Sequence, residues 1–214
     1  LCVKGVGLNV ALDPLMTLVL AGCQAGMVLL VGDDPGGWGS QNEQDSRMLA
    51  LAAEIPLIEP RSVRDARRAI REAFALSEKV GVPVMVRITR ALTLDTDALG
   101  EAPDYEVPVP SGFVREYMKW VVLPVNVVAY HQRLRERLDK VRFYHERSAL
   151  NEIVGHGAMG LIAAGYTGRK VLDLLPKERR SGVSMLWLGT VNPLPSDVVR
   201  SWLGRVGAVL VVEE

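Results

Sequence analysis

The stretch Val28-Leu-Leu-Val-Gly-Asp-Asp-Pro-Gly-Gly-Trp-Gly-Ser-Gln-Asn-Glu-Gln-Asp-Ser-Arg47 decides the fold. It begins within an uninterrupted apolar run, Met27 to Val31, which is typical of a strand buried on both faces of a parallel sheet. The run breaks at Gly32 into a loop of acidic, glycine and amide residues, and a helix is expected to begin near Ser46. Ligands of open α/β sheets bind just beyond the carboxyl ends of strands, so this loop is where a site is expected. The alternative is a polar surface loop without a role, and composition favours neither.

The segments on both sides of this loop alternate between strand and helix patterns. Asp13 and Pro14 are expected to open a helix, because aspartate caps helices and proline suits the first helical position. Ser62 and Gly81 are expected to cap and stop the clearest helix of the chain. The expected elements are the helix 15–26, the helix 48–54, the strand 56–60, the helix between Ser62 and Gly81 and the strand 82–88. This order predicts a parallel sheet with crossover helices.

The second half of the chain begins with a break in the pattern. From 89 to 112 acidic residues alternate with prolines, which predicts an exposed linker. A helix of about 126–147 then carries His131 and His145, each without a second ligand at i+4, so solvated surface histidines are favoured over metal ligands. The elements expected after it are the strands 159–164, 183–188 and 208–212 and the helices 168–175 and 195–203. The fold class is therefore α/β with two incomplete parallel-sheet domains, at 1–90 and 155–214, joined by the linker and helix of 91–154.

Composition narrows the classes of function. Lys and Arg together number 25 and so do Asp and Glu, which gives no reason to expect nucleic acid or an anionic membrane surface as a partner. Apolar residues make up 49%, enough for a core, yet the apolar runs stop far short of the ~20 residues of a membrane span. Leu1 is not a start methionine and no signal peptide follows it, so a piece of a longer cytoplasmic protein is expected. Cys2 and Cys23 cannot build a metal cluster by themselves.

Three motifs carry a resemblance to a known family. They are Lys4-Gly-Val-Gly-Leu-Asn-Val-Ala-Leu-Asp-Pro-Leu-Met16, Asp33-Asp-Pro-Gly36 and Ser40-Gln-Asn-Glu-Gln-Asp45. They resemble the thiamine-diphosphate-dependent 2-oxoacid:ferredoxin oxidoreductases, and among these most closely the large (alpha) subunits of the indolepyruvate type. Trp120-Val-Val-Leu-Pro124 and Leu188-Gly-Thr-Val-Asn-Pro-Leu-Pro195 continue the likeness, which covers nearly the whole chain. The run from Ser40 to Asp45 is its most specific part.

The resemblance implies both a fold and an activity. Residues 1–90 would be the later part of the domain that grips the aminopyrimidine ring of thiamine diphosphate, and 155–214 the start of a transketolase C-terminal-like domain, both three-layered. The implied activity is oxidative decarboxylation of aryl 2-oxoacids such as indolepyruvate to acyl-coenzyme A, with ferredoxin as electron acceptor. Thiamine diphosphate, Mg²⁺ and 4Fe–4S clusters are the implied cofactors, the last two bound outside this chain. The implied partners in an oligomer are the rest of the large subunit, a small gamma/beta-type subunit, ferredoxin and coenzyme A.

The residue types of the central loop suit an anionic substrate and its cofactor. A desolvated anion needs fixed donors, and neutral donors avoid burying a second charge. The candidate donors are Ser40, Gln41, Asn42 and Gln44. Asp45 is either an acceptor that orients these amides or the cap of the following helix, and Arg47 either its partner or a substrate clamp.

Lys4 and Asn9 complete the candidate cofactor-binding set. Both lie after an expected strand end, so they are expected to face the same cleft as the loop. Lys4 would offset the carboxylate of the substrate, although an exposed lysine is the more frequent outcome.

Several parts of a working enzyme are missing. In the family that the chain resembles, the catalytic glutamate lies upstream of the position that matches Lys4, so no catalytic residue is assigned and residues 1–214 are expected to be inactive alone. Gly32-Asp33-Asp34 is similar to the family's magnesium motif, but Asn42 follows too soon, so no metal site is expected. Two alternatives remain: a non-catalytic scaffold of the same ancestry, or a Rossmann-like nucleotide binder, although Gly5 and Gly7 lack the third glycine of that motif.

Overall fold

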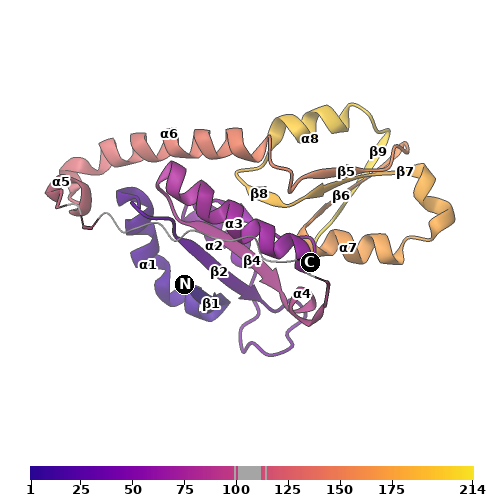
Figure 1. The fold of residues 1–214 in the computed structure, drawn as a ribbon, viewed down its shortest axis with the longest axis horizontal. Helices are drawn as coiled ribbons and strands as arrows, with labels where there is room; N and C mark the ends of the chain where they lie inside the picture. Colours follow the sequence, from indigo (N-terminus) through magenta and orange to yellow (C-terminus); the bar gives the residue numbers. More distant parts are fainter. Residues whose placement is uncertain (99, 101–111, 114) are drawn as a thin grey trace.

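The computed structural model describes residues 1–98, 100, 112–113 and 115–214, which form two α/β units (Figure 1). The first sheet has the strand order β1-β2-β4-β3-β8. Its strands are β1 (Cys2–Lys4), β2 (Val28–Asp33), β3 (Leu57–Ile58), β4 (Val84–Thr89) and β8 (Thr190–Asn192). The first four are parallel, as the order of elements predicts, and β8 runs antiparallel to β3. The carboxyl ends of β1, β2 and β4 therefore meet at one edge.

The second sheet has the order β5-β7-β6-β9. Its strands are β5 (Glu152–Val154), β6 (Met159–Ala164), β7 (Val183–Leu188) and β9 (Ala208–Val212), and its helices are α7 (Gly165–Leu174), the 3₁₀ helix η2 (Lys177–Gly182) and α8 (Ser196–Leu203). β6 pairs in parallel with β7 and β9, while β5 is antiparallel to β7. The three strands expected in this half, 159–164, 183–188 and 208–212, are confirmed.

Helices cover the first sheet and connect it to the second (Figure 1). They are α1 (Gly5–Ala21), α2 (Ser46–Ala52), α3 (Val63–Val80), α4 (Arg90–Leu94), α5 (Tyr117–Trp120), the 3₁₀ helix η1 (Pro124–Asn126) and α6 (Val127–His145). α3 has the predicted ends: the Ser62 hydroxyl accepts the backbone N–H of Asp65 at 3.1 Å, and Gly81 adopts a left-handed conformation with φ 71°. α4 lies in the segment expected to be a linker, of which residues 99 and 101–111 lie outside the described residues.

The start of α1 differs from the prediction. The helix begins at Gly5, so Pro14 lies in its interior and Asp13 does not cap it. An interior proline costs about 3 kcal/mol. Leu8, Leu15 and Val19 lie at helical spacing and are at most 4% exposed, and burying each such side chain contributes about 1.5–3 kcal/mol. Their combined burial outweighs the proline, so the apolar stripe and not the local start signal sets the length of the helix.

The prediction for the histidines of α6 is wrong for His145 and only partly right for His131. His145 is 1% exposed, and His131 is partly buried. The reason is the face of the helix: His145 follows Leu134 and Val141 at helical spacing, and both of these are buried against the first unit. A position on the inner stripe therefore outweighs the polarity of the side chain.

The packing of the two units bears on the expected boundaries. β8 comes from the second half of the chain but pairs with β3 in the first sheet, with Leu57 opposite Asn192. The side-chain amide of Asn192 also donates to the Ile55 carbonyl at 2.8 Å. The domain boundaries at 90 and 155 stay a prediction. The structure adds that one strand from the second half of the chain, β8, belongs to the first sheet. Within the described ranges, no helix combines the length and the apolar character needed to cross a bilayer.

Candidate functional site

A cavity of about 350 Å³ lies at the carboxyl ends of β1, β2 and β4. Its lining residues come from the strand ends, from the loop after β2 and from the start of α4: Lys4, Gly32, Asp33, Asp34, Trp38, Gly39, Ile88, Thr89, Arg90 and Thr93. This edge is where open α/β sheets bind ligands. The cavity is therefore the candidate functional site.

Two residues that line this cavity each have a buried polar atom with no hydrogen-bond partner among the described residues. These atoms are Oδ1 of Asp34 and Oγ1 of Thr89, on side chains that belong to residues 9% and 6% exposed. Buried polar groups in native proteins are nearly always paired, because leaving one unpaired costs about 1–3 kcal/mol. Asp34 and Thr89 both line the cavity, so their unpaired groups are candidates for hydrogen bonds to a polar ligand.

The mouth of the cavity carries positive charge and an aromatic ring. Lys4 is exposed, and the guanidinium of Arg90 lies 4.7 Å from the ring centre of Trp38, which is itself 69% exposed. A guanidinium over an indole face is a cation–π contact, which holds both side chains near the opening. These side chains can contact a ligand with a flat apolar body, while the carboxylate of Asp34 in the same lining partly offsets the two cations.

The floor of the site rests on a buried group of charges. Arg87 donates through Nε to Asp33 at 2.6 Å, and its Nη1 lies 3.3 Å from Oε1 of Glu59, outside hydrogen-bonding geometry. Asp33 also accepts the backbone N–H and the hydroxyl of Ser46, at 3.0 and 2.5 Å. Burial raises the pKa of Glu59, and the charge of Arg87 only partly offsets this effect. The group ties the ends of β2, β3 and β4 to the first turn of α2.

Asn9 and Gln44, two of the predicted site residues, lie together. The Asn9 amide donates to Oε1 of Gln44 at 2.6 Å, and Nε2 of Gln44 donates to the Gly5 carbonyl at 3.2 Å and to Oδ1 of Asn9 at 3.1 Å. These bonds fasten the central loop to α1. Asn9 lies on the helix and not after a strand end, because α1 begins before it.

Asp45 caps α2, one of the two roles expected for it. Its Oδ1 accepts the backbone N–H of Arg47 at 3.0 Å, and the Arg47 guanidinium pairs with both carboxylate oxygens. Burial alone would raise the pKa of Asp45, but the hydrogen bonds and the charge of Arg47 lower it below its ordinary value. Arg47 is thus the partner of Asp45, and it also donates to the Glu214 carbonyl at 3.1 Å.

The remaining loop residues lie outside the lining of the cavity. Ser40 is partly buried, whereas Gln41 and Asn42 are exposed, and the lining reaches only to the preceding Gly39. Lys4 is the one predicted residue that lines the cavity, and the role of the others in binding stays a prediction. Among the described residues, no group of three or more His, Cys, Asp or Glu side chains is arranged to hold a metal ion.

Sequence reasoning missed Asp34, Arg87 and Thr89. A signal for Arg87 was present, because an arginine inside the apolar run 82–88 must find a buried partner if that run is a central strand. Asp33 and Thr89 pair across β2 and β4 in the sheet register. Thr89 is therefore placed at the site by strand pairing, which the order of residues does not reveal.

Solved structures define the class of fold. The chain superposes with a TM-score of 0.72 on a 2-oxoglutarate:ferredoxin oxidoreductase from Magnetococcus marinus, over 98% of this chain and 45% of that one, at 15% identity. A split-gene transketolase, an inactive beta4 tetramer, gives a TM-score of 0.53 over 100% of this chain and 56% of that one, at 13% identity. The fold is therefore that of the α/β domains of oxoacid:ferredoxin oxidoreductases and transketolases, as expected from the sequence.

Proteins similar in sequence match the chain over almost its whole length. No protein-family model matches the chain. It is 36% identical over 221 residues to the indolepyruvate oxidoreductase subunit IorA of Pyrococcus horikoshii, covering 99% of this chain and 34% of that protein. The IorA subunit of Methanothermobacter thermautotrophicus is 33% identical over 214 residues, with the same coverage. The chain thus spans about a third of the length of these relatives, and its resemblance to the large subunits of the indolepyruvate type is confirmed.

Proposed function

We propose that the chain is part of a thiamine-diphosphate-dependent oxidoreductase that converts aryl 2-oxoacids to acyl-coenzyme A and passes electrons to ferredoxin. Similarity to IorA subunits over 99% of the chain supports the general reaction. The observation that carries the proposal is the cavity at the carboxyl ends of β1, β2 and β4, where Asp34 and Thr89 keep unpaired polar atoms. A small gamma/beta-type subunit and the rest of the large subunit would complete the site, so residues 1–214 alone are proposed to be inactive.

The cavity fits the aminopyrimidine ring of the cofactor. That ring presents an amino donor and ring-nitrogen acceptors, which match the unpaired Oδ1 of Asp34 and the hydroxyl of Thr89. A volume of about 350 Å³ has room for this ring, and Mg²⁺ and the iron–sulfur clusters would be bound outside this chain. Thiamine diphosphate, when bound, supplies the electron sink that decarboxylation requires. The protein residues position the reacting groups.

The mouth of the cavity suits the substrate. Lys4 and Arg90 place two positive charges there, which offset the carboxylate of a 2-oxoacid. The exposed face of Trp38 offers a stacking surface to an aryl group. These three residues would select an aromatic anion over a neutral or small aliphatic molecule.

Removing the Thr89 hydroxyl should weaken cofactor binding without unfolding the protein. Thr89→Val keeps the shape of the side chain, and the lost hydroxyl has no partner among the described residues. One lost hydrogen bond of about 1–1.5 kcal/mol corresponds to a roughly tenfold weaker affinity. Calorimetric titration of the complete protein with thiamine diphosphate and Mg²⁺ measures the change, with Thr96→Val as an exposed control. Equal affinity would remove Thr89 from the site, and the absence of saturable heat in the unsubstituted protein would contradict the proposed function.

Replacing both Gln41 and Asn42 with alanine should lower turnover of the aryl 2-oxoacid by about tenfold while the protein stays folded. Both side chains are exposed, so their loss costs little stability, whereas a lost donor to the bound anion costs about 1.4 kcal/mol or more. Steady-state kinetics of the complete enzyme give the turnover, and thermal unfolding checks the fold. Gln24→Ala, an exposed amide on another loop, is the control. Unchanged kinetics in the double variant would exclude these residues from the reaction.

A further inference from the structure

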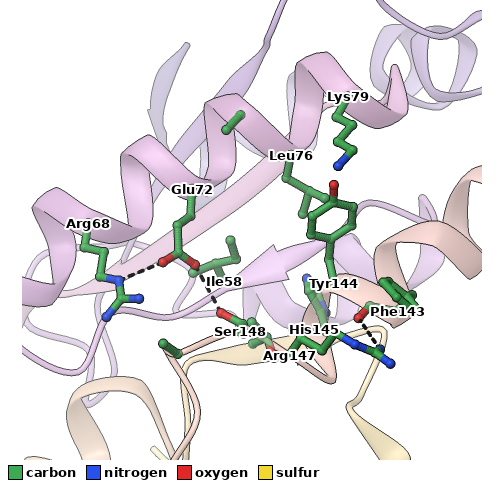
Figure 2. A pocket seen from close by; sticks show the side chains of 13 residues that line it. Ile58, Arg68, Glu72, Leu76, Lys79, Phe143, Tyr144, His145, Arg147 and Ser148 are labelled. Atoms are coloured by element: carbon green, nitrogen blue, oxygen red, sulfur yellow. Dashed lines mark hydrogen bonds and ion pairs between the residues drawn. The ribbon is translucent and has the colours of Figure 1, made fainter.

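A second cavity, of about 650 Å³, lies between α3 and the end of α6 (Figure 2). It shares no lining residue with the strand-end cavity. Its volume lies within the range of about 300–1,000 Å³ that small-molecule pockets occupy. Leu76 and Ile58 form an apolar part of its lining, the apolar floor, and Tyr144 lines it as well (Figure 2). The cavity therefore has room and apolar surface for a flat organic molecule.

Two cations of this cavity have no carboxylate partner among the described residues. Nζ of Lys79 lies 4.7 Å from the ring centre of Tyr144, and the guanidinium of Arg147 lies 3.6 Å from that of Phe143. Arg147 also donates to the Phe143 carbonyl at 3.2 Å. These contacts hold both cations beside aromatic faces while leaving their charges uncompensated.

The one carboxylate among the lining residues cannot neutralise these cations. One oxygen of Glu72 accepts from Nε of Arg68 at 2.7 Å, and the other accepts from the Ser148 hydroxyl at 3.1 Å (Figure 2). Arg68 and Glu72 cancel each other, so Lys79 and Arg147 leave the lining with an excess of two positive charges. A ligand of this cavity is therefore expected to be an anion.

His145 also lines the cavity, and one of its ring nitrogens is an unpaired acceptor. Its Nδ1 lies 2.8 Å from the Pro193 carbonyl, which can only accept, so Nδ1 carries the proton of the neutral ring. Nε2 is then an acceptor, and it is buried without a partner among the described residues. Burial lowers the pKa of His145 to about 4 although the bond to Pro193 opposes this, so the ring is neutral at physiological pH. A ring N–H or a hydroxyl of a ligand would complement this acceptor.

We propose that this cavity is a binding site for a small aromatic carboxylate. The aromatic body would lie over the apolar floor beside Tyr144, and the carboxylate would pair with Lys79 and Arg147. A donor on the ring would turn toward His145. The site is separate from the strand-end cavity, so it does not depend on the function proposed there.

Titration of the complete protein with indole-3-acetate tests the proposal. This probe has a flat ring, a ring N–H and a carboxylate, and indole-3-acetamide is its neutral counterpart. We expect saturable binding of the acetate, with the amide at least tenfold weaker because a charge-assisted bond contributes about 1.5–3 kcal/mol. Absence of saturable binding, or equal affinity for the two probes, would overturn the proposal.

Variants locate the binding. The double variant Lys79→Gln/Arg147→Gln should bind the acetate at least tenfold more weakly, whereas Arg71→Gln/Arg133→Gln, with the same change of charge at exposed positions of α3 and α6 outside the cavity, should not. Ala75→Trp places a large ring in the cavity from an exposed helix position and should abolish binding. Full affinity in Ala75→Trp would place the probe elsewhere and overturn the proposal. Thiamine diphosphate binding is measured separately, so failure of either proposal is seen by itself.

Discussion

Replacing Arg87 with methionine should lower the free energy of unfolding by about 3–5 kcal/mol, because the change leaves buried charges without their partner. The side chains of Asp33 and Glu59 are 1% and 5% exposed, and Arg87, 3% exposed, is the cation between them. Urea unfolding measures this loss of free energy. The slope of the unfolding free energy against urea concentration should stay the same in the variant. The effect should shrink as the pH falls, because burial raises the pKa of Glu59, and once protonated this carboxyl no longer carries a charge that methionine cannot balance.

An exposed arginine is the control for this substitution. Arg142 pairs with Asp139 at 2.8 Å, with side chains 51% and 71% exposed, and Arg142→Met should cost less than about 1 kcal/mol. A loss below 1 kcal/mol in Arg87→Met would mean that water reaches the buried group. The same result would remove the argument that this group fixes the floor of the strand-end cavity.

Acidification should destabilise the protein through His145, by about 3 kcal/mol between pH 6.5 and pH 4. Burial lowers the pKa of His145 in the folded protein to about 4, below its ordinary value of 6.5. As the pH falls between these values, the unfolded chain binds the proton and the folded one does not, so folding becomes less favourable. The stabilisation is fully present above pH 6.5 and is lost progressively down to pH 4.

A variant without the imidazole separates the contribution of His145 to the pH dependence of stability from that of other groups. His145→Gln lacks the titrating ring, so the difference in unfolding free energy between it and the unsubstituted protein should narrow as the pH falls from 7 to 4. Carboxylates such as Glu59 and Asp45 also titrate in acid, but they contribute equally to both proteins and cancel in the difference. A difference that does not change with pH would show that His145 binds its proton equally well in the folded and unfolded states, which would contradict the lowered pKa.

The sequence was most informative where apolar runs are long and bounded. The strands 159–164, 183–188 and 208–212 have the predicted boundaries because each run is mostly apolar and of ordinary strand length. β1, β5 and β8 have three residues each, too few to show a period, and they depend on pairing with strands distant in sequence. Short strands of this kind become visible only in the folded sheet.

Local signals failed where tertiary packing opposed them. Pro14 is a good first residue of a helix, but the burial of Leu8 extends α1 past it toward the N-terminus. His145 is polar, yet its helix face is covered. In both cases burial contributes more free energy than the local preference, so reasoning from neighbouring residues gave the wrong result.

The position of the candidate site was predictable, but its members were less so. The rule that ligands bind at strand ends located the cavity and Lys4. The amides of the central loop drew attention because of their number, whereas Asn9 and Gln44 hydrogen-bond each other instead of lining the cavity. Thr89 was not recognised because a single threonine at the end of an apolar strand carries no motif.

The antiparallel strand β8 has a consequence for the ancestry of the chain. Residues 190–192 pair with the outer side of β3, so this edge of the first sheet is covered only when the second unit is present. A gene fusion that transferred residues 1–90 to another protein would leave β3 as a bare edge, prone to pair with foreign strands. We therefore expect gene rearrangements to keep the segments that encode the two units together.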